Sequence, residues 1–146
     1  MDVDVISETT IARPRSVVAA YAGDPDSAPA WYVNIKSVRW VTKPPLRVGS
    51  RIAFAAEFLG KRLVYTYEIV ELIPGELLRM RTAEGPFPME TTYTWESTSD
   101  GGTRMTLRNR GSPSGFFNLV APIMSIAMRR ENRKDLSNLK RILERA

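Results

Sequence analysis

The sequence contains neither cysteine nor histidine, and both absences narrow the chemistry that this chain can perform. Without cysteine the protein forms no disulfide, offers no thiolate to a metal and has no thiol nucleophile. Without histidine it lacks the commonest general base and the commonest metal ligand at neutral pH. Carboxylates at metal-ligand spacing and a P-loop are also missing from the sequence. We therefore expect no metal and no cofactor, and any acid–base work falls to Asp, Glu, Tyr or a perturbed Lys.

Long apolar runs are lacking too, and we expect no signal peptide. The longest mostly apolar stretch covers residues 116–128 and is interrupted by Asn118, Pro122 and Ser125, whereas a membrane-spanning helix needs about 20 apolar residues. Residues 1–10 are acidic and alternating, without the positive and apolar regions of a signal peptide. These features predict a cytoplasmic protein with no membrane span, and they leave transient contact with a membrane surface open.

The 146 residues that are present have an ordinary globular composition, with 43% hydrophobic and 25% charged residues. This length is near the mode for one domain and can bury a substantial core. The sequence shows no internal repeat, low-complexity segment or linker. We expect a single domain over residues 1–146.

The net charge of +5 is unevenly placed. Residues 129–146 hold seven Lys or Arg and three acids, so most of the excess belongs to the C-terminal end. A nucleic-acid surface would interleave aromatic residues with such charges, and none occur there. We favour a solvated helix face with basic residues placed well for the helix dipole, and expect no nucleic-acid partner.

Between residues 35 and 110 apolar and polar side chains alternate, which is typical of strands with one buried face. Tight turns are indicated at residues 60–61, 74–75 and 100–102, where Gly or Pro-Gly occurs. Because such short turns exclude parallel crossovers, we expect an antiparallel sheet. A first strand is expected around Val3 and Val5. The six further strands are expected over residues 36–42, 51–59, 63–72, 77–82, 89–97 and 103–110.

Helical signals flank this strand-rich region. After the first strand, one short helix opens at residues 12–14, with Thr10 as its expected N-cap, and a second covers residues 26–33. The segment 114–146 reads as one long helix, with an apolar stripe at spacings of three and four residues. Pro122 lacks a backbone donor, so we expect a kink or break near residues 118–122. Several strands followed by one long helix indicate a sheet wrapped against that helix, a shape that can leave a hollow between them.

Several short phrases, weak singly, give the chain a family resemblance. They read AWYVNIKSV at residues 30–38, VGSR at 48–51, TWE at 94–96 with GGTRMT at 101–106, and LSNLK at 136–140. Together with the element order, they resemble the START/Bet v 1-like (SRPBCC) superfamily, in particular its polyketide cyclase/dehydrase and lipid-transport group. The resemblance covers nearly the whole chain and implies an α+β helix-grip fold. In that fold a curved, seven-stranded antiparallel sheet surrounds a long C-terminal helix, with two short helices after the first strand.

The resemblance also implies an apolar tunnel between sheet and helix, holding lipids, sterols, polyketides or quinones. The inward faces carry many large aromatics, the final helix offers pliable methionines, and one amide interrupts its apolar stripe. A filled core, with tyrosine hydroxyls reaching the sheet rim, is the alternative to a cavity. The candidate cavity-lining residues are Trp31, Tyr32, Phe54, Phe58, Tyr65, Tyr67, Tyr93, Trp95, Met124, Met128 and Asn132.

Charged candidates inside the sheet are few. Glu57 and Glu68 fall on the wet face by alternation, while Glu71 points inward unless a bulge intervenes. Arg79 and Arg81 share a mixed face, and outward salt bridges are expected for them in preference to an anchoring role in the cavity. The apolar loop over residues 85–89 is either a lid or a wide hairpin.

The leading functional hypothesis is binding of a hydrophobic small molecule, such as a lipid, polyketide or isoprenoid, for carriage, sensing or sequestration. The first alternative is an enzyme of the polyketide aromatase/cyclase or dehydratase kind, which works largely by positioning and leaves little motif. The second is a protein-interaction module that uses the basic end of the final helix. We expect a monomer or a homodimer, and an enzyme is the less favoured reading.

Overall fold

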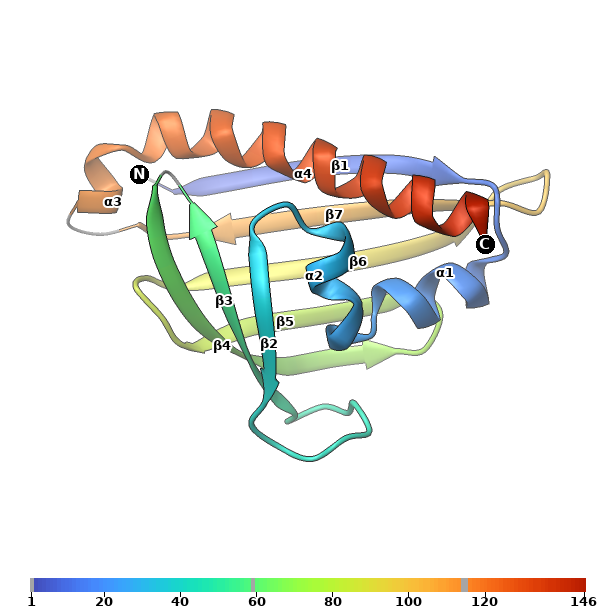
Figure 1. Cartoon of the computed structure of the whole chain (residues 1–146), viewed down its shortest axis with the longest axis horizontal. Coiled ribbons are helices and arrows are strands. Elements are labelled where there is room, and N and C mark those ends of the chain that lie inside the picture. The colour runs from blue at the N-terminus through green and yellow to red at the C-terminus, as the bar shows by residue number, and fades with distance from the viewer. Residues whose placement is uncertain (1, 59, 114–115) are drawn as a thin grey trace.

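The computed structural model describes residues 2–58, 60–113 and 116–146, and its centre is a strongly curled antiparallel sheet (Figure 1). In these residues the strand order is β1-β7-β6-β5-β4-β3-β2. Each strand from β2 to β6 therefore pairs with the next strand in the sequence, and β1 pairs with β7. The strands are β1 (Val3–Ile11), β2 (Ile35–Trp40), β3 (Arg51–Phe58), β4 (Lys61–Ile73), β5 (Leu77–Glu84), β6 (Met89–Ser97) and β7 (Thr103–Gly111).

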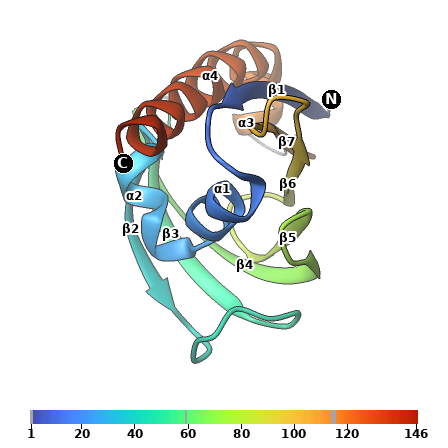
Figure 2. The same ribbon diagram turned by 90° about the vertical axis from the view of Figure 1, so that its right-hand side faces the viewer.

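Helices occupy the connection after β1 and the C-terminal part of the chain. Three short segments follow β1: α1 (Arg15–Ala22), the 3-10 turn η1 (Pro25–Ser27) and α2 (Ala28–Trp31). A single turn, α3 (Phe116–Leu119), precedes the long α4 (Ala121–Arg145), which runs across the hollow side of the sheet (Figures 1 and 2). The expected helix-grip fold is confirmed.

The expected helix break is also confirmed, because Val120 separates α3 from α4 and Pro122 lies in the first turn of α4. A proline in the first turn gives up only an N–H that has no partner within the helix. The expected N-cap at Thr10 is wrong. Thr10 lies in β1 opposite Arg104, and α1 begins after Pro14, with no side-chain cap.

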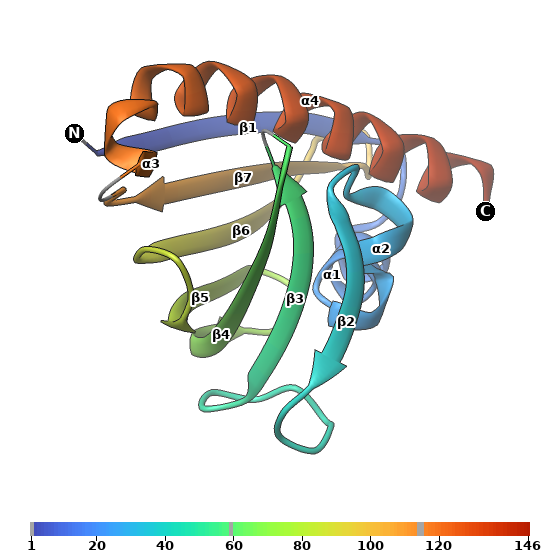
Figure 3. The same ribbon diagram turned by 60° about the vertical axis from the view of Figure 1, so that its left-hand side comes forward.

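Two apolar clusters fill the space between sheet and helices. The larger one packs α1, α2 and the C-terminal half of α4 against the sheet, with Trp31, Leu107 and Leu139 fully buried. The smaller one joins Val5 and Met89 to Met124, near the start of α4. The β3–β4 hairpin rises toward α4 in Figure 3 and contributes Leu63 and Tyr65 to this second cluster.

The outer face of the sheet is polar, and most of its arginines lie in ion pairs. Five ion pairs join Arg51 to Glu68, Arg81 and Arg110 to Glu90, Arg104 to Glu96, and Arg108 to Asp4, at 2.7–3.1 Å.

Arg79 and Arg81 both take part in this outer network, as expected. A register shift between Ile69 and Glu71 interrupts the alternation of β4 and leaves Glu71 paired with Arg79. Glu71 is thereby removed from the inward candidates. Among the described helices, none is long and apolar enough to cross a membrane.

Candidate functional site

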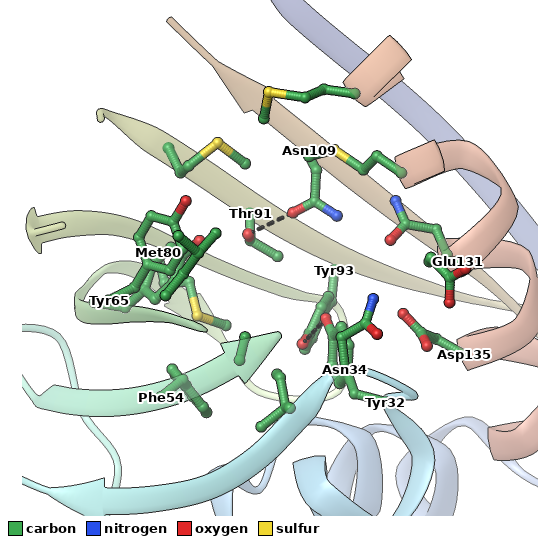
Figure 4. A pocket seen from close by; sticks show the side chains of 18 of the residues that line it. Tyr32, Asn34, Phe54, Tyr65, Met80, Thr91, Tyr93, Asn109, Glu131 and Asp135 are labelled. Carbon is green, nitrogen blue, oxygen red and sulfur yellow. Dashed lines mark hydrogen bonds between the residues drawn. The ribbon is translucent and has the colours of Figure 1, made fainter. Parts of the chain in front are cut away.

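A cavity of about 140 Å³ lies between the concave face of the sheet and the N-terminal half of α4 (Figure 4). A single water needs about 10–15 Å³ on this measure, so the space accommodates several waters or a small organic molecule. Its walls come from the segment between α2 and β2, from strands β2 to β7, from the loop before β6, and from α4. The lining residues are Tyr32, Asn34, Ile35, Phe54, Ala56, Leu63, Tyr65, Tyr67, Met80, Phe87, Met89, Thr91, Tyr93, Asn109, Met124, Met128, Glu131, Asn132 and Asp135.

One part of this wall is apolar. Phe54, Tyr65 and Met80 lie together at one end in Figure 4. The ring of Tyr65 meets Phe87 edge-on, with centroids 6.1 Å apart, so the loop before β6 closes this end. Met124 adds a thioether from α4, and such unbranched side chains adapt easily to a guest.

The opposite end is polar. Tyr32 and Asn34 lie there across from Glu131 and Asp135 of α4 (Figure 4). The hydroxyls of Tyr32 and Tyr93 are hydrogen-bonded at 2.6 Å. Burial raises the pKa of both phenols, so both stay protonated at neutral pH and can act as hydrogen-bond donors or acceptors, but not as bases.

A second polar group lies in the middle of the sheet. Thr91 donates to the side-chain oxygen of Asn109 at 2.6 Å, across β6 and β7. Burial raises the pKa of the neighbouring Tyr67 to about 12, and a hydrogen bond with Thr91 opposes part of that rise. The sheet therefore offers neutral hydrogen-bonding groups to the cavity at two places.

Asp135 is the most unusual residue of the polar end, since it is a carboxyl with only 3% of its surface exposed. One oxygen accepts a hydrogen bond from the backbone N–H of Val33 at 2.8 Å. Burial raises the pKa of Asp135 to about 7; the bond from Val33 and the charge of Lys134 oppose the rise, whereas Glu131 adds to it. A carboxyl with a pKa near the working pH is suited to exchanging protons.

Asn132, one turn before Asp135 on the same face of α4, is 4% exposed. Its side-chain nitrogen is buried and has no hydrogen-bond partner among the described residues. A buried donor of this kind costs free energy unless something accepts from it. The cavity wall thus carries a free donor beside a protonatable acceptor.

Most of the predicted cavity residues do line this space. The structure places eight of the eleven candidates on the wall: Tyr32, Phe54, Tyr65, Tyr67, Tyr93, Met124, Met128 and Asn132. Trp31 and Trp95 are buried in the larger apolar cluster, outside the wall. The ring of Trp31 packs against that of Tyr32, with centroids 4.2 Å apart and the ring planes tilted by 36°, and so supports the wall from behind. Phe58 belongs to β3, but its side chain lies outside the described residues.

Sequence reasoning missed several lining residues, among them the polar residues Asn109 and Asp135. Asn109 follows Met105 and Leu107 in the inward alternation of β7, and that spacing was the available signal. Asp135 lies three residues after Asn132 on α4, but charged residues are so seldom buried that the spacing alone did not single it out. Among the described residues, no group of three or more Asp, Glu, His or Cys side chains could hold a metal ion.

Residues 2–144 match the family described as polyketide cyclase / dehydrase and lipid transport, and the chain belongs to that family. No curated protein matches the sequence significantly.

Solved structures with the same fold are similar along almost the entire chain. The Zhui aromatase/cyclase from Streptomyces sp. R1128 has a TM-score of 0.84 at 14% identity, covering 99% of this chain and 95% of its own. TTHA0849 from Thermus thermophilus has a TM-score of 0.81 at 21% identity, covering 94% of each chain. A START superfamily protein from Mycobacterium smegmatis has a TM-score of 0.73 at 14% identity, covering 97% of this chain and 94% of that one. At these identities the likeness establishes the fold.

Proposed function

We propose that the protein binds a small hydrophobic molecule with a polar group at one end, for carriage, sensing or sequestration. The observation that carries the proposal is the division of the cavity. Phe54, Tyr65 and Met80 lie at one end, and Tyr32, Asn34 and Asp135 lie at the other. Asn132 lines the cavity one turn before Asp135 on α4. A few hydrogen-bonding groups in a mostly apolar cavity are the usual composition of a small-molecule site.

The two ends of the cavity would bind different parts of the ligand. Its apolar body would gain roughly 25 cal/mol per Å² buried, before ordering costs. Its polar group would accept from the side-chain nitrogen of Asn132, which otherwise lacks a partner among the described residues, and would meet Asp135. The described cavity is comparable to one that holds a single aromatic ring. A longer lipid, polyketide or isoprenoid would therefore displace the pliable wall formed by Phe87, Met124 and Met128.

Native mass spectrometry of the purified protein, before and after organic extraction, tests this proposal. We expect a bound mass of several hundred daltons that disappears on denaturation. In Ala56→Phe a bulky ring fills the cavity from β3, and this variant should lose the bound mass while keeping the fold. Ala20→Leu, a similar enlargement at an exposed position of α1, is the matched control and should keep it. Equal occupancy in both variants would contradict binding in this cavity.

A second candidate function, catalysis of the aromatase/cyclase or dehydratase kind, is favoured by one observation. Asp135 presents a buried carboxyl, with a pKa of about 7, to the cavity. Such a group can take a proton from a carbon next to a carbonyl and return it to a departing hydroxyl. No arginine of the described residues lines the cavity, so Asn132 and the Tyr32–Tyr93 pair would have to stabilise a developing enolate.

The two functions differ in what Asp135→Asn should do. For a binding protein, the substitution leaves ligand occupancy within a few-fold of wild type and has no turnover to lose. For an enzyme, occupancy persists but a poly-β-ketone substrate is no longer converted. Product analysis of wild type and Asp135→Asn by liquid chromatography separates the cases.

A further inference from the structure

The outward side of the chain around the start of α4 is apolar. Leu119 in α3 is 82% exposed, and Ile123 and Ile126 in α4 are 59% and 68% exposed. These are large aliphatic side chains gathered in one short segment, on the side of the helix that faces away from the sheet. Met124 of the same helical turn is buried and lines the cavity, so α4 is apolar here on both its inner and its outer side.

Basic residues continue the same outward stripe. Ile123, Ile126, Arg130 and Arg133 follow one another at spacings of three and four residues, which places them along one side of α4. Arg129 is a further exposed cation close to this stripe. We call Leu119, Ile123, Ile126, Arg129, Arg130 and Arg133 the α4 outer patch.

The arginines of the α4 outer patch differ in their ion pairing from most arginines of the sheet. On the outer face of the sheet most arginines lie in ion pairs with carboxylates, such as Arg108–Asp4 and Arg104–Glu96. Within the described residues, Arg129, Arg130 and Arg133 have no such ion pair. Glu131, the nearest acid, lies on the cavity side and within 3.8 Å of Lys134. The patch therefore combines exposed aliphatic side chains with uncompensated positive charge.

From this combination we propose that the α4 outer patch docks the protein on an anionic lipid bilayer. A helix with exposed apolar residues next to basic ones lies in the plane of a membrane, its apolar residues in the acyl boundary and its cations among the headgroups. Each such cation contributes attraction to a negatively charged leaflet. A nucleic acid or an acidic protein surface would match the arginines but would give Leu119, Ile123 and Ile126 nothing apolar to contact.

Docking in this way would place the cavity wall directly above the bilayer. Met124 and Met128 line the cavity from the same helical segment that carries Ile123 and Ile126 outward. A hydrophobic ligand could then pass between bilayer and cavity along the N-terminal half of α4 without crossing water. The docking itself does not depend on the cavity's being a binding site, because the patch is a separate surface.

Sedimentation with vesicles, without added ligand, tests the docking. We expect the wild-type protein to sediment with vesicles of 70% phosphatidylcholine and 30% phosphatidylglycerol. It should bind pure phosphatidylcholine far more weakly and be released by 0.5 M NaCl. Ile123→Ser/Ile126→Ser and Arg130→Gln/Arg133→Gln should each weaken binding to the anionic vesicles about ten- to thirtyfold.

Two matched controls lie far from α4, in β2 and the loop after it (Figure 1). Val41→Ser/Val48→Ser removes two aliphatic side chains that are 46% and 59% exposed, and Arg39→Gln/Arg47→Gln removes two exposed charges. Both should bind like wild type, and circular dichroism should show every variant folded. The proposal is overturned by failure to bind anionic vesicles, by control variants that lose as much affinity as the patch variants, or by patch-dependent binding to an acidic protein or nucleic acid instead. Ala56→Phe should lose the bound mass and still bind vesicles, because the patch and the cavity are separate. Vesicle binding without any bound mass in wild type would count against the ligand proposal alone, and a bound mass without vesicle binding would count against the docking proposal alone.

Discussion

At the scale of single residues, Asp135 connects the stability of the protein to its chemistry. An aspartate with a pKa of about 7 carries a proton in the folded state over a pH range in which the unfolded chain has lost it. Folded protein thus binds more protons than unfolded protein between the ordinary pKa of 3.8 and about 7. The contribution of Asp135 to stability must then fall as pH rises through this window and stay low above it.

Asp135→Asn should therefore stabilise the protein at alkaline pH. The amide still accepts from the Val33 N–H but never has to ionise inside the cavity. Urea unfolding should give nearly equal free energies for wild type and variant near pH 4. The variant should gain roughly 2–4 kcal/mol by pH 8, corresponding to a pKa displaced by up to about three units. Asp2→Asn, at an exposed position, is the control and should show no such trend. A difference that is constant between pH 4 and pH 8 would contradict the buried, protonated carboxyl.

At the scale of elements, the two halves of α4 are packed differently. Its C-terminal half packs Leu136, Leu139 and Leu143 into the larger apolar cluster. The end of β1 and the segment after it hold the same half: Arg13 donates to the Leu143 carbonyl at 2.9 Å, and Lys140 donates to the Thr10 carbonyl at 2.7 Å. The N-terminal half instead faces the cavity with flexible methionines. We therefore expect the C-terminal half to fix the helix on the sheet and the N-terminal half to move more easily.

Side-chain truncations in the two halves of α4 should therefore lower the stability of the protein by different amounts. Leu139→Ala removes a fully buried side chain and should cost roughly 2–5 kcal/mol, whereas the half-buried Met128→Ala should cost less than about 1 kcal/mol. Hydrogen exchange should show slower amides over residues 136–145 than over residues 121–128, because opening the first segment exposes the core. Similar costs for the two substitutions, together with uniform exchange, would indicate that α4 moves as one rigid unit.

The same elements show how far sequence patterns reach. Alternation and glycine turns located every strand, and Pro122 located the break before α4, because these signals are local. The bulge at Glu71 has no such local signal, because it depends on how two neighbouring strands pair.

The candidate site could likewise be predicted only in part. The inward tyrosines and methionines could be predicted from the alternation along the strands and the spacing of three and four residues along α4. Which buried aromatics line a cavity, however, depends on where the short helices pack. Trp31 and Trp95 consequently support the core, while Asp135 enters the wall because Val33 offers it a hydrogen bond.

At the scale of the whole molecule, the cavity lies between the sheet and its gripping helix, so filling it should stabilise the entire fold. A ligand that binds only the folded state adds about 2.7 kcal/mol when present at one hundred times its Kd. For a domain of this size that corresponds to a rise in Tm of roughly 5–10 °C. Organic extraction should lower the Tm of wild-type protein by a shift in this range, and returning the extracted fraction should restore it. Ala56→Phe should show neither change, because its cavity is already filled, whereas Ala20→Leu should follow wild type. If extraction left the Tm of every variant unchanged, the space between sheet and helix would hold no ligand that stabilises the fold. The proposed binding function would then be wrong.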